Sequence, residues 1–281
     1  MTNSLAALRN PNITIHNKPD LKLLRFSSNQ TTDAGKITLA LNKEFDRAEK
    51  QLGIETNEKP AQISYQTLTP VAAETILTQR IRNFTNITEK LIYNDTLTGL
   101  LNKRAYQKDR IDLFIDSCQK QQPISLISFD LDKFKSYNDT FGHPEGDVAL
   151  AEFGRIVKET LGENGKAYRV GGEELIALLP NRTLQETQEI AEDIRNNIET
   201  QTLKLLETNK LKRALTVSIG YSSFNPTNEV KDAKELYKKE PSTKFRSLFE
   251  NTFIKMEEIA DNSLYEAKNT GRNKIVGAEI F

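Results

Sequence analysis

Four acidic residues in two short segments are the side chains best suited to chemistry in this chain. Asp130 and Asp132 follow an apolar run, and Glu173 and Glu174 follow a pair of glycines. If the two segments form neighbouring strands, Asp130 and Glu173 meet at one edge of a sheet. Carboxylates suit Mg²⁺, or alternatively Mn²⁺, together with the oxygens of a bound phosphate. We therefore predict that the four acids converge on one cation, although any one of them alone is equally explained as a solvated loop residue.

The glycine pair, Gly171 and Gly172, predicts a tight hairpin that carries the second pair of acids. Glycine adopts the positive φ of such turns and lets a ligand approach the backbone. Adjacent acids repel each other unless a cation is present. Because successive strand residues point to opposite faces, we expect only one of Glu173 and Glu174 to face a given metal. The other would face a second metal or a basic partner.

Basic residues accompany both ends of the predicted site. Lys133 and Lys135 flank the first acidic segment, and Lys268 and Arg272 stand four apart at the end of the last predicted helix. Cations there complement the helix dipole, which is a sufficient structural explanation for them alone. The same pair also forms a fork for phosphate oxygens, since Arg binds them in bidentate fashion.

Asn138 and Asp147 supply an amide and a carboxylate in the segment between the acidic pairs. Together these groups match the hydrogen-bonding edge of guanine, whereas adenine presents fewer donors to a carboxylate. The alternative is that Asp147 caps the following helix. His143 has no second His, Ser or Cys nearby, so we expect it to support the loop.

The elements that position these residues predict an α+β domain. Apolar runs and turn residues predict a central strand at 124–129, a hairpin from 166–170 and 174–179, a strand at 215–221 and a short strand at 275–276. Periodic apolar residues predict helices at 103–120, 133–140, 147–161, 184–198 and 253–268. Since the glycine pair makes a hairpin, we expect a mainly antiparallel sheet flanked by helices. A polar stretch at 222–251 is expected to be a surface excursion.

A mostly helical N-terminal region should precede this domain. Residues 1–69 form a region of unknown type, with a helix over 33–52 that Asp33 caps and a linker over 53–69. Residues 70–93 form a connecting helix, and residues 94–281 form the catalytic domain. One apolar stripe runs along the connecting helix: Leu77, Ile81, Phe84, Ile87 and Leu91. Such a stripe fits a coiled-coil seam between two copies or a helix packed on its own domain.

Composition narrows the classes of protein. The chain has 281 residues, of which 37% are apolar and 28% charged, as expected of a soluble globular protein. Lys plus Arg and Asp plus Glu both number 39, so no global charge attracts nucleic acid or an anionic membrane. The single cysteine, Cys118, excludes an intrachain disulfide and is expected to be inert. No run approaches a membrane span of about 18 apolar residues, and we see no signal peptide. A cytoplasmic location is expected.

From residue 94 to about 278 the chain resembles the GGDEF-domain diguanylate cyclases. The resemblance is carried by five ordered segments: Asp95–Arg104, Asp130–Asp147, Arg169–Leu175, Thr216–Gly220 and Ala260–Asn273. It implies a palm-like sheet and a Mg²⁺-dependent reaction in which two GTP molecules become cyclic di-GMP and two pyrophosphates. In that family each of two facing domains holds one GTP, so a homodimer is implied.

The resemblance also implies a role for each matched residue. Asp130, Glu173 and the Leu131 carbonyl would hold the metal, and Glu174 would assist it or the 3′-hydroxyl. Asn138 and Asp147 would bind guanine. The triphosphate would be held by Lys135, Lys268 and Arg272, with the backbone amides near Lys133 and Phe134.

Departures from the family pattern refine these expectations. The signature reads Gly-Gly-Glu-Glu-Leu, ending in Leu175, which keeps an acid and an apolar residue at the variable positions. The Arg-x-x-Asp product-binding motif of many relatives is replaced by Gly162-Glu163-Asn164-Gly165, so we expect no product inhibition there. The alternatives are a catalytically silent nucleotide-binding module that acts through protein contacts and a polymerase-like or adenylyl cyclase activity. Residues 1–70 are left to sense a ligand or bind a partner.

Overall fold

The computed structural model describes residues 31–51, 69–226, 237 and 243–280. Contacts divide the chain into two units, Met1–Leu91 and Ile92–Phe281. Residues 1–30 and the predicted linker over 53–69, apart from Thr69, lie outside the described residues.

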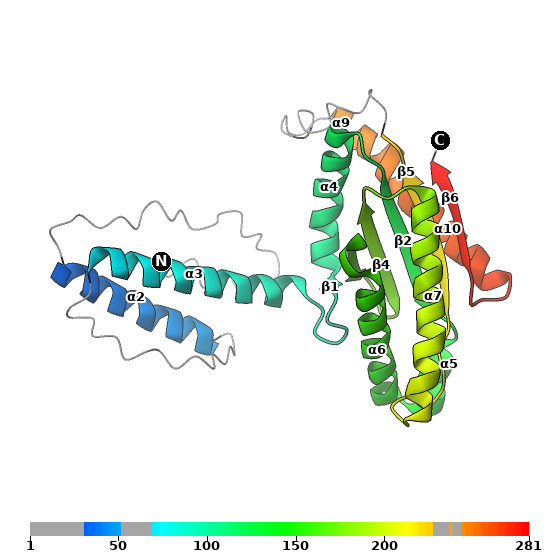
Figure 1. Cartoon of the computed structure of the whole chain (residues 1–281), viewed down its shortest axis with the longest axis horizontal. Coiled ribbons are helices and arrows are strands. Elements are labelled where there is room, and N and C mark those ends of the chain that lie inside the picture. Colours follow the sequence, from blue (N-terminus) through cyan, green and yellow to red (C-terminus); the bar gives the residue numbers. More distant parts are fainter. Residues whose placement is uncertain (1–30, 52–68, 227–236, 238–242, 281) are drawn as a thin grey trace. The chain divides into compact units, whose positions relative to one another are not determined.

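Two helices make up the described part of the first unit, α2 (Thr31–Gln51) and α3 (Pro70–Tyr93) (Figure 1). Helix α3 has its predicted bounds, whereas α2 begins two residues before Asp33, so the predicted cap at Asp33 is wrong. The Phe45 and Phe84 rings lie 5.4 Å apart between their centroids, and Arg80 bonds Asp46 and Glu49.

The apolar stripe of α3 is therefore used in part within the chain. Leu77 is fully buried and Phe84 packs on α2, as the own-domain alternative predicts. Leu91 remains 53% exposed near the end of the helix.

A six-stranded sheet forms the centre of the second unit. Its order is β1-β3-β4-β2-β5-β6. The strands are β1 (Leu101–Asn102), β2 (Ile124–Leu131), β3 (Lys166–Arg169), β4 (Glu174–Pro180), β5 (Val217–Phe224) and β6 (Ile275–Ile280). The inner pairs β3–β4, β4–β2 and β2–β5 are antiparallel, and the outer pairs β1–β3 and β5–β6 are parallel. This confirms the predicted α+β class with a mainly antiparallel sheet.

Helices cover both faces of this sheet (Figure 1). They are α4 (Lys103–Lys120), α5 (Phe134–Phe141), α6 (His143–Leu161), α7 (Leu184–Glu207), α9 (Thr243–Phe249) and α10 (Lys255–Asn269). One core contains Ile127, Phe129 and Leu131 with α5, α6 and α7, and a second contains Leu126 with α4, α9 and α10. This alternation along β2 follows from the two-residue period of a strand.

Two predicted features of this unit are wrong. Helix α6 begins at His143, because the chain turns at Gly142 with φ 87°, so Asp147 lies inside the helix and does not cap it. The stretch 222–251 is not only a surface excursion, since β5 extends to Phe224 and Phe249 packs on Phe114. Phe245 and Phe249, the aromatic residues near the end of this polar stretch, pack on Phe114 in the second core.

Cys118 is fully buried, and burial raises the pKa of its thiol to about 12. The thiol therefore stays protonated, in agreement with the predicted inert role. Among the helices that the structure describes, none is sufficiently long and apolar to cross a membrane.

Candidate functional site

The acidic edge of the sheet brings together two of the predicted metal ligands. Asp130, on the face of β2 opposite Phe129, stands opposite Glu174 in the register of β2 and β4, one residue after Glu173. Asp130 is 8% exposed, and its Oδ2 lies 2.8 Å from the Lys268 Nζ at the end of α10. Residues from three distant segments thus meet at this edge, as predicted.

Glu173 shows the electrostatic character of the cluster. Burial raises the pKa of its carboxyl, the charges of Asp130 and Glu174 raise it further, and Lys268 opposes them. Negative charge is therefore in excess at this edge. Asp130, Glu173 and the Leu131 carbonyl are hard oxygen donors, and Mg²⁺ characteristically takes one or two carboxylates plus substrate phosphates. The donor set and its excess negative charge fit that ion.

The predicted convergence of all four acids on one cation is wrong. Within the described residues, no three His, Cys, Asp or Glu side chains are grouped so that they could hold a metal ion. Asp132 points instead into protein donors: Thr216 Oγ1 donates to it at 2.7 Å, Ser218 Oγ at 2.6 Å and the Asn273 backbone N–H at 2.9 Å. The carboxylate is 7% exposed. Asp132 joins β2 to β5 and to the loop after α10.

The glycine turn works differently from the prediction. Neither Gly171 nor Gly172 has a left-handed φ. A Cβ on Gly171 would lie 2.4 Å from the Glu174 Oε2, so this glycine makes room for the Glu174 carboxylate. A Cβ on Gly172 would meet nothing within 4 Å. Open space beside Gly172 agrees with the expected approach of a ligand to the backbone.

Arg169, for which we predicted no role, holds this turn. Arg169 donates to the Gly172 carbonyl through Nε at 3.0 Å and Nη2 at 2.8 Å, and its Nη1 lies 3.2 Å from Asp95 Oδ1. Asp95 in turn accepts hydrogen bonds from the Thr98 N–H and hydroxyl. Burial alone would raise the pKa of Asp95, but Thr98 and Arg169 outweigh it, so this pKa lies below its ordinary value. This pair could have been found from the sequence, because Asp95 and Arg169 are the first residues of two of the five segments that carry the family resemblance.

The predicted guanine-binding residues come from consecutive helices. Asn138 on α5 packs against Gly146 on α6, where a Cβ would lie 1.7 Å from the Asn138 Oδ1. That oxygen is buried and has no hydrogen-bond partner. Asp147 follows Gly146 and is exposed. The structure thus offers an unpaired acceptor beside an exposed carboxylate, and both are suited to N–H donors of a base.

Cationic groups lie at two helix ends near the acidic edge. Lys133, with φ 58°, precedes α5, whose first turn has no side-chain cap, and Lys135 is exposed on that turn. Lys268 ends α10, and Arg272 is exposed in the following loop with φ 65°. Arg213, which the sequence did not suggest, donates from Nη2 to the Lys133 carbonyl at 3.3 Å. Uncapped helix amides and cations together suit phosphate oxygens.

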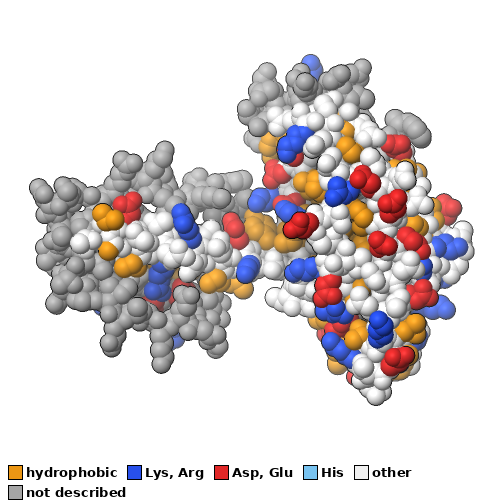
Figure 2. Space-filling model, viewed as in Figure 1, with side chains coloured by type: hydrophobic (Ala, Val, Ile, Leu, Met, Phe, Trp, Pro, Cys, Tyr) orange, Lys and Arg blue, Asp and Glu red, His pale blue; other side chains and the backbone are white. Residues whose placement is uncertain are grey.

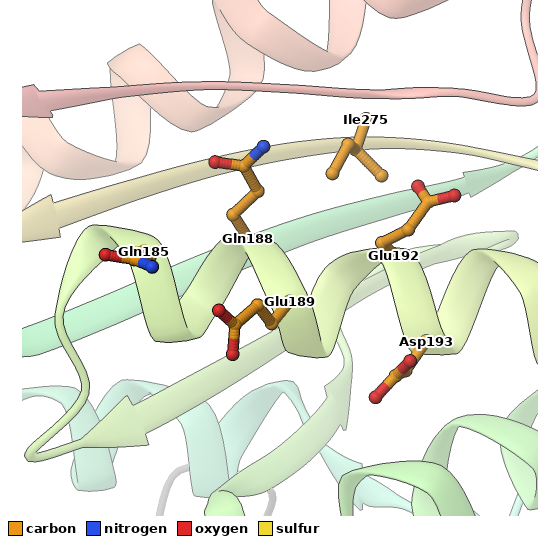
Figure 3. A pocket seen from close by; sticks show the side chains of 6 residues that line it. All are labelled: Gln185, Gln188, Glu189, Glu192, Asp193 and Ile275. Atoms are coloured by element: carbon orange, nitrogen blue, oxygen red, sulfur yellow. The ribbon is translucent and has the colours of Figure 1, made fainter.

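Other surfaces match the predicted chemistry less well. A pocket of about 560 Å³ lies along α7 and is lined by Gln185, Gln188, Glu189, Glu192, Asp193 and Ile275 (Figure 3). Its three carboxylates would repel a phosphate, and none of the predicted site residues lines it. The face in Figure 2 shows acidic and basic side chains intermixed.

Comparisons with known proteins agree with this geometry. The family model described as "Diguanylate cyclase, GGDEF domain" matches residues 92–240. Diguanylate cyclase A of Treponema denticola is 33% identical over 159 residues, which are 57% of this chain and 36% of that protein. The chain spans less than half the length of the first curated relatives that it matches.

Two solved structures share the fold. The active GGEEF domain of a diguanylate cyclase from Vibrio cholerae is 27% identical and has a TM-score of 0.51, with 63% of this chain and 97% of that chain covered. The Pseudomonas aeruginosa diguanylate cyclase SiaD, in complex with its activator SiaC, is 24% identical and has a TM-score of 0.56, with 99% and 97% covered. With the family model matching more than half of its residues, the chain belongs to the GGDEF family of diguanylate cyclase domains.

Proposed function

We propose that this protein is an active diguanylate cyclase, which joins two GTP molecules into cyclic di-GMP and releases two pyrophosphates. The observation that supports this most is the meeting of Asp130, Glu173 and Lys268 at one sheet edge, where burial, and then the charges of Asp130 and Glu174, raise the pKa of Glu173. The membership of the family supports the same activity.

The base of each GTP would be held between α5 and α6. Asn138, whose buried Oδ1 has no hydrogen-bond partner among the described residues, and the exposed Asp147 carboxylate would together accept the N–H groups of guanine. Adenine offers no N1–H, so Asp147 favours GTP over ATP. A buried acceptor left unpaired costs about 1–3 kcal/mol, which a guanine donor would recover.

The triphosphate would be held by groups at the ends of two helices, α10 and α5. Lys268 and Arg272 approach from the end of α10, and Lys135 with the backbone N–H groups of Lys133 and Phe134 approaches from the start of α5. These cations neutralise the pyrophosphate as it leaves. The reaction needs little covalent help from the protein, because phosphoryl and nucleotidyl transfer depends chiefly on positioning and charge.

Asp130, Glu173 and the Leu131 carbonyl would hold Mg²⁺, or Mn²⁺. When bound, the ion supplies charge neutralisation to the phosphate oxygens and lowers the pKa of the attacking 3′-hydroxyl. Glu174, which is exposed and lies over Gly171, would orient that hydroxyl. Each domain holds one GTP, so turnover requires two copies that face each other.

Two proposals concern how the enzyme is regulated. The Gly162–Asn164 turn has neither Arg nor Asp, so we propose that product inhibition through the Arg-x-x-Asp site is absent. SiaD, which this chain resembles in fold, was solved with a protein activator. We propose that the N-terminal unit likewise receives a protein or ligand signal.

The test is incubation of the purified chain with GTP and Mg²⁺, with chromatography of the products. Cyclic di-GMP and pyrophosphate in a 1:2 ratio are expected, with none from ATP. Glu173→Ala should abolish turnover, and Glu163→Ala is the matched control because that acid lies in the turn between α6 and β3. GTP binding without turnover would identify a silent binding module instead.

A further inference from the structure

Asp132 is the acid of the cluster that the proposed reaction does not use. It is buried, yet the three groups that donate hydrogen bonds to its carboxylate are neutral and lie on other segments: Thr216, Ser218 and Asn273. A buried carboxylate normally has a charged partner or a full set of hydrogen bonds. Asp132 has the second arrangement, so its role is to hold what donates to it.

The donor farthest along the sequence from Asp132 is the backbone N–H of Asn273, which lies 2.9 Å from Oδ2. Asn273 directly follows Arg272 in the loop after α10. Both residues have left-handed φ angles, 65° for Arg272 and 45° for Asn273, although neither is glycine. L-residues rarely adopt this conformation unless the surroundings impose it. The bond to Asp132 is one such constraint.

A second tether reaches the same residue from α7. Arg195 Nη1 donates to the Asn273 Oδ1 at 2.9 Å, and Arg195 is itself paired with Glu192 and Glu199. Asn273 is therefore held by its main chain from β2 and by its side chain from α7. The preceding Arg272 remains exposed, and no ion pair joins it to any described residue.

We propose that Asp132 is a positioning residue: by holding the Asn273 N–H it fixes the strained 272–273 backbone and aims the Arg272 guanidinium at the triphosphate. Asp132 touches neither nucleotide nor metal. This inference rests on the proposed function, since Arg272 is taken to bind the phosphates of GTP. It assigns the second acid of the Asp-x-Asp segment to the phosphate side of the site rather than to the cation.

The experiment measures binding, with calorimetry of GTP and of GMP to the full chain in the presence of Ca²⁺ and without turnover. Asp132→Ala should weaken GTP binding about tenfold and leave GMP binding within about twofold, because GMP lacks the outer phosphates. Asp132→Asn should keep most of the affinity, since one amide oxygen still accepts the Asn273 N–H. A metal ligand would lose function in both variants.

A double-mutant cycle with Arg272→Ala isolates the route of action. If Asp132 works through Arg272, Asp132→Ala costs no further GTP affinity in the Arg272→Ala background. Additive losses would overturn the proposal. Ser218→Ala is the matched control: it removes a bond to the other oxygen, Oδ1, and leaves the loop tether in place, so GTP affinity should stay within about twofold.

Two further outcomes decide the remaining cases. If Asp132→Ala does not fold, Arg195→Gln removes the second tether and should also weaken GTP binding selectively, and unchanged GTP affinity in the folded variant would overturn the proposal. Equal losses of GTP and GMP affinity would likewise overturn it. Absence of cyclic di-GMP from the wild-type chain would sink the proposed enzyme alone, whereas the selective effect on GTP binding can be measured without turnover.

Discussion

Arg169 holds the turn that precedes Glu173, and its hydrogen bonds allow a quantitative prediction of what the loss of this restraint costs. Arg169→Lys keeps the positive charge but removes the planar fork that donates twice to the Gly172 carbonyl. Each bond contributes about 1 kcal/mol net, so the turn loses about 2 kcal/mol of restraint. If the whole loss falls on the transition state, the rate of cyclic di-GMP formation drops about 30-fold.

The assay is the initial rate of product formation at saturating GTP and Mg²⁺, with thermal unfolding of the same samples. The control is Arg110→Lys, because Arg110 has a similar exposure, 25% against 17% for Arg169, and holds Glu257 at the other end of α10 from Lys268. Both variants should lose a similar amount of stability, but only Arg169→Lys should lose rate. Wild-type activity in Arg169→Lys, or an equal loss in Arg110→Lys, would refute the reasoning.

Three further predictions use other features of the two units. Gly171→Ala should cost little stability, because only the flexible end of Glu174 must move, yet lower the rate at unchanged GTP affinity; activity equal to wild type would separate Glu174 from the reaction. Asp95 has a lowered pKa in the folded protein, so its carboxylate stabilises the folded state at pH values above its ordinary pKa of 3.8. This contribution is lost as the pH falls through the pKa of the folded state. In Asp95→Asn the melting temperature should therefore fall less steeply in acid than in the wild type. Leu91→Asp should weaken the proposed dimer, as measured by sedimentation, and reduce turnover, whereas Phe84→Asp would also break the contact with Phe45.

Much of the GGDEF domain could be predicted because its patterns are local. The buried run before Asp130 forms a central strand, and helix α4 has its predicted bounds, with Asn102 accepting hydrogen bonds from its first turn. The sequence pattern failed for two different reasons. Helix α6 starts at His143 because of the local residues Gly142 and Pro144, which the prediction passed over, whereas the polar stretch before Phe249 ends in the core through a tertiary aromatic contact.

The acidic segment shows why the site itself was only half predictable. Sequence spacing places Asp130 and Asp132 on the same face of an extended chain, and both are competent metal ligands by residue type. What separates them is the end of β2 at Leu131, beyond which the chain turns toward β5 and the loop after α10. Asp130 then meets Lys268 while Asp132 meets the Asn273 N–H, a partner 141 residues away that no local pattern indicates. In our proposals Asp130 is therefore left for the cation, and Asp132 fixes the loop that carries Arg272.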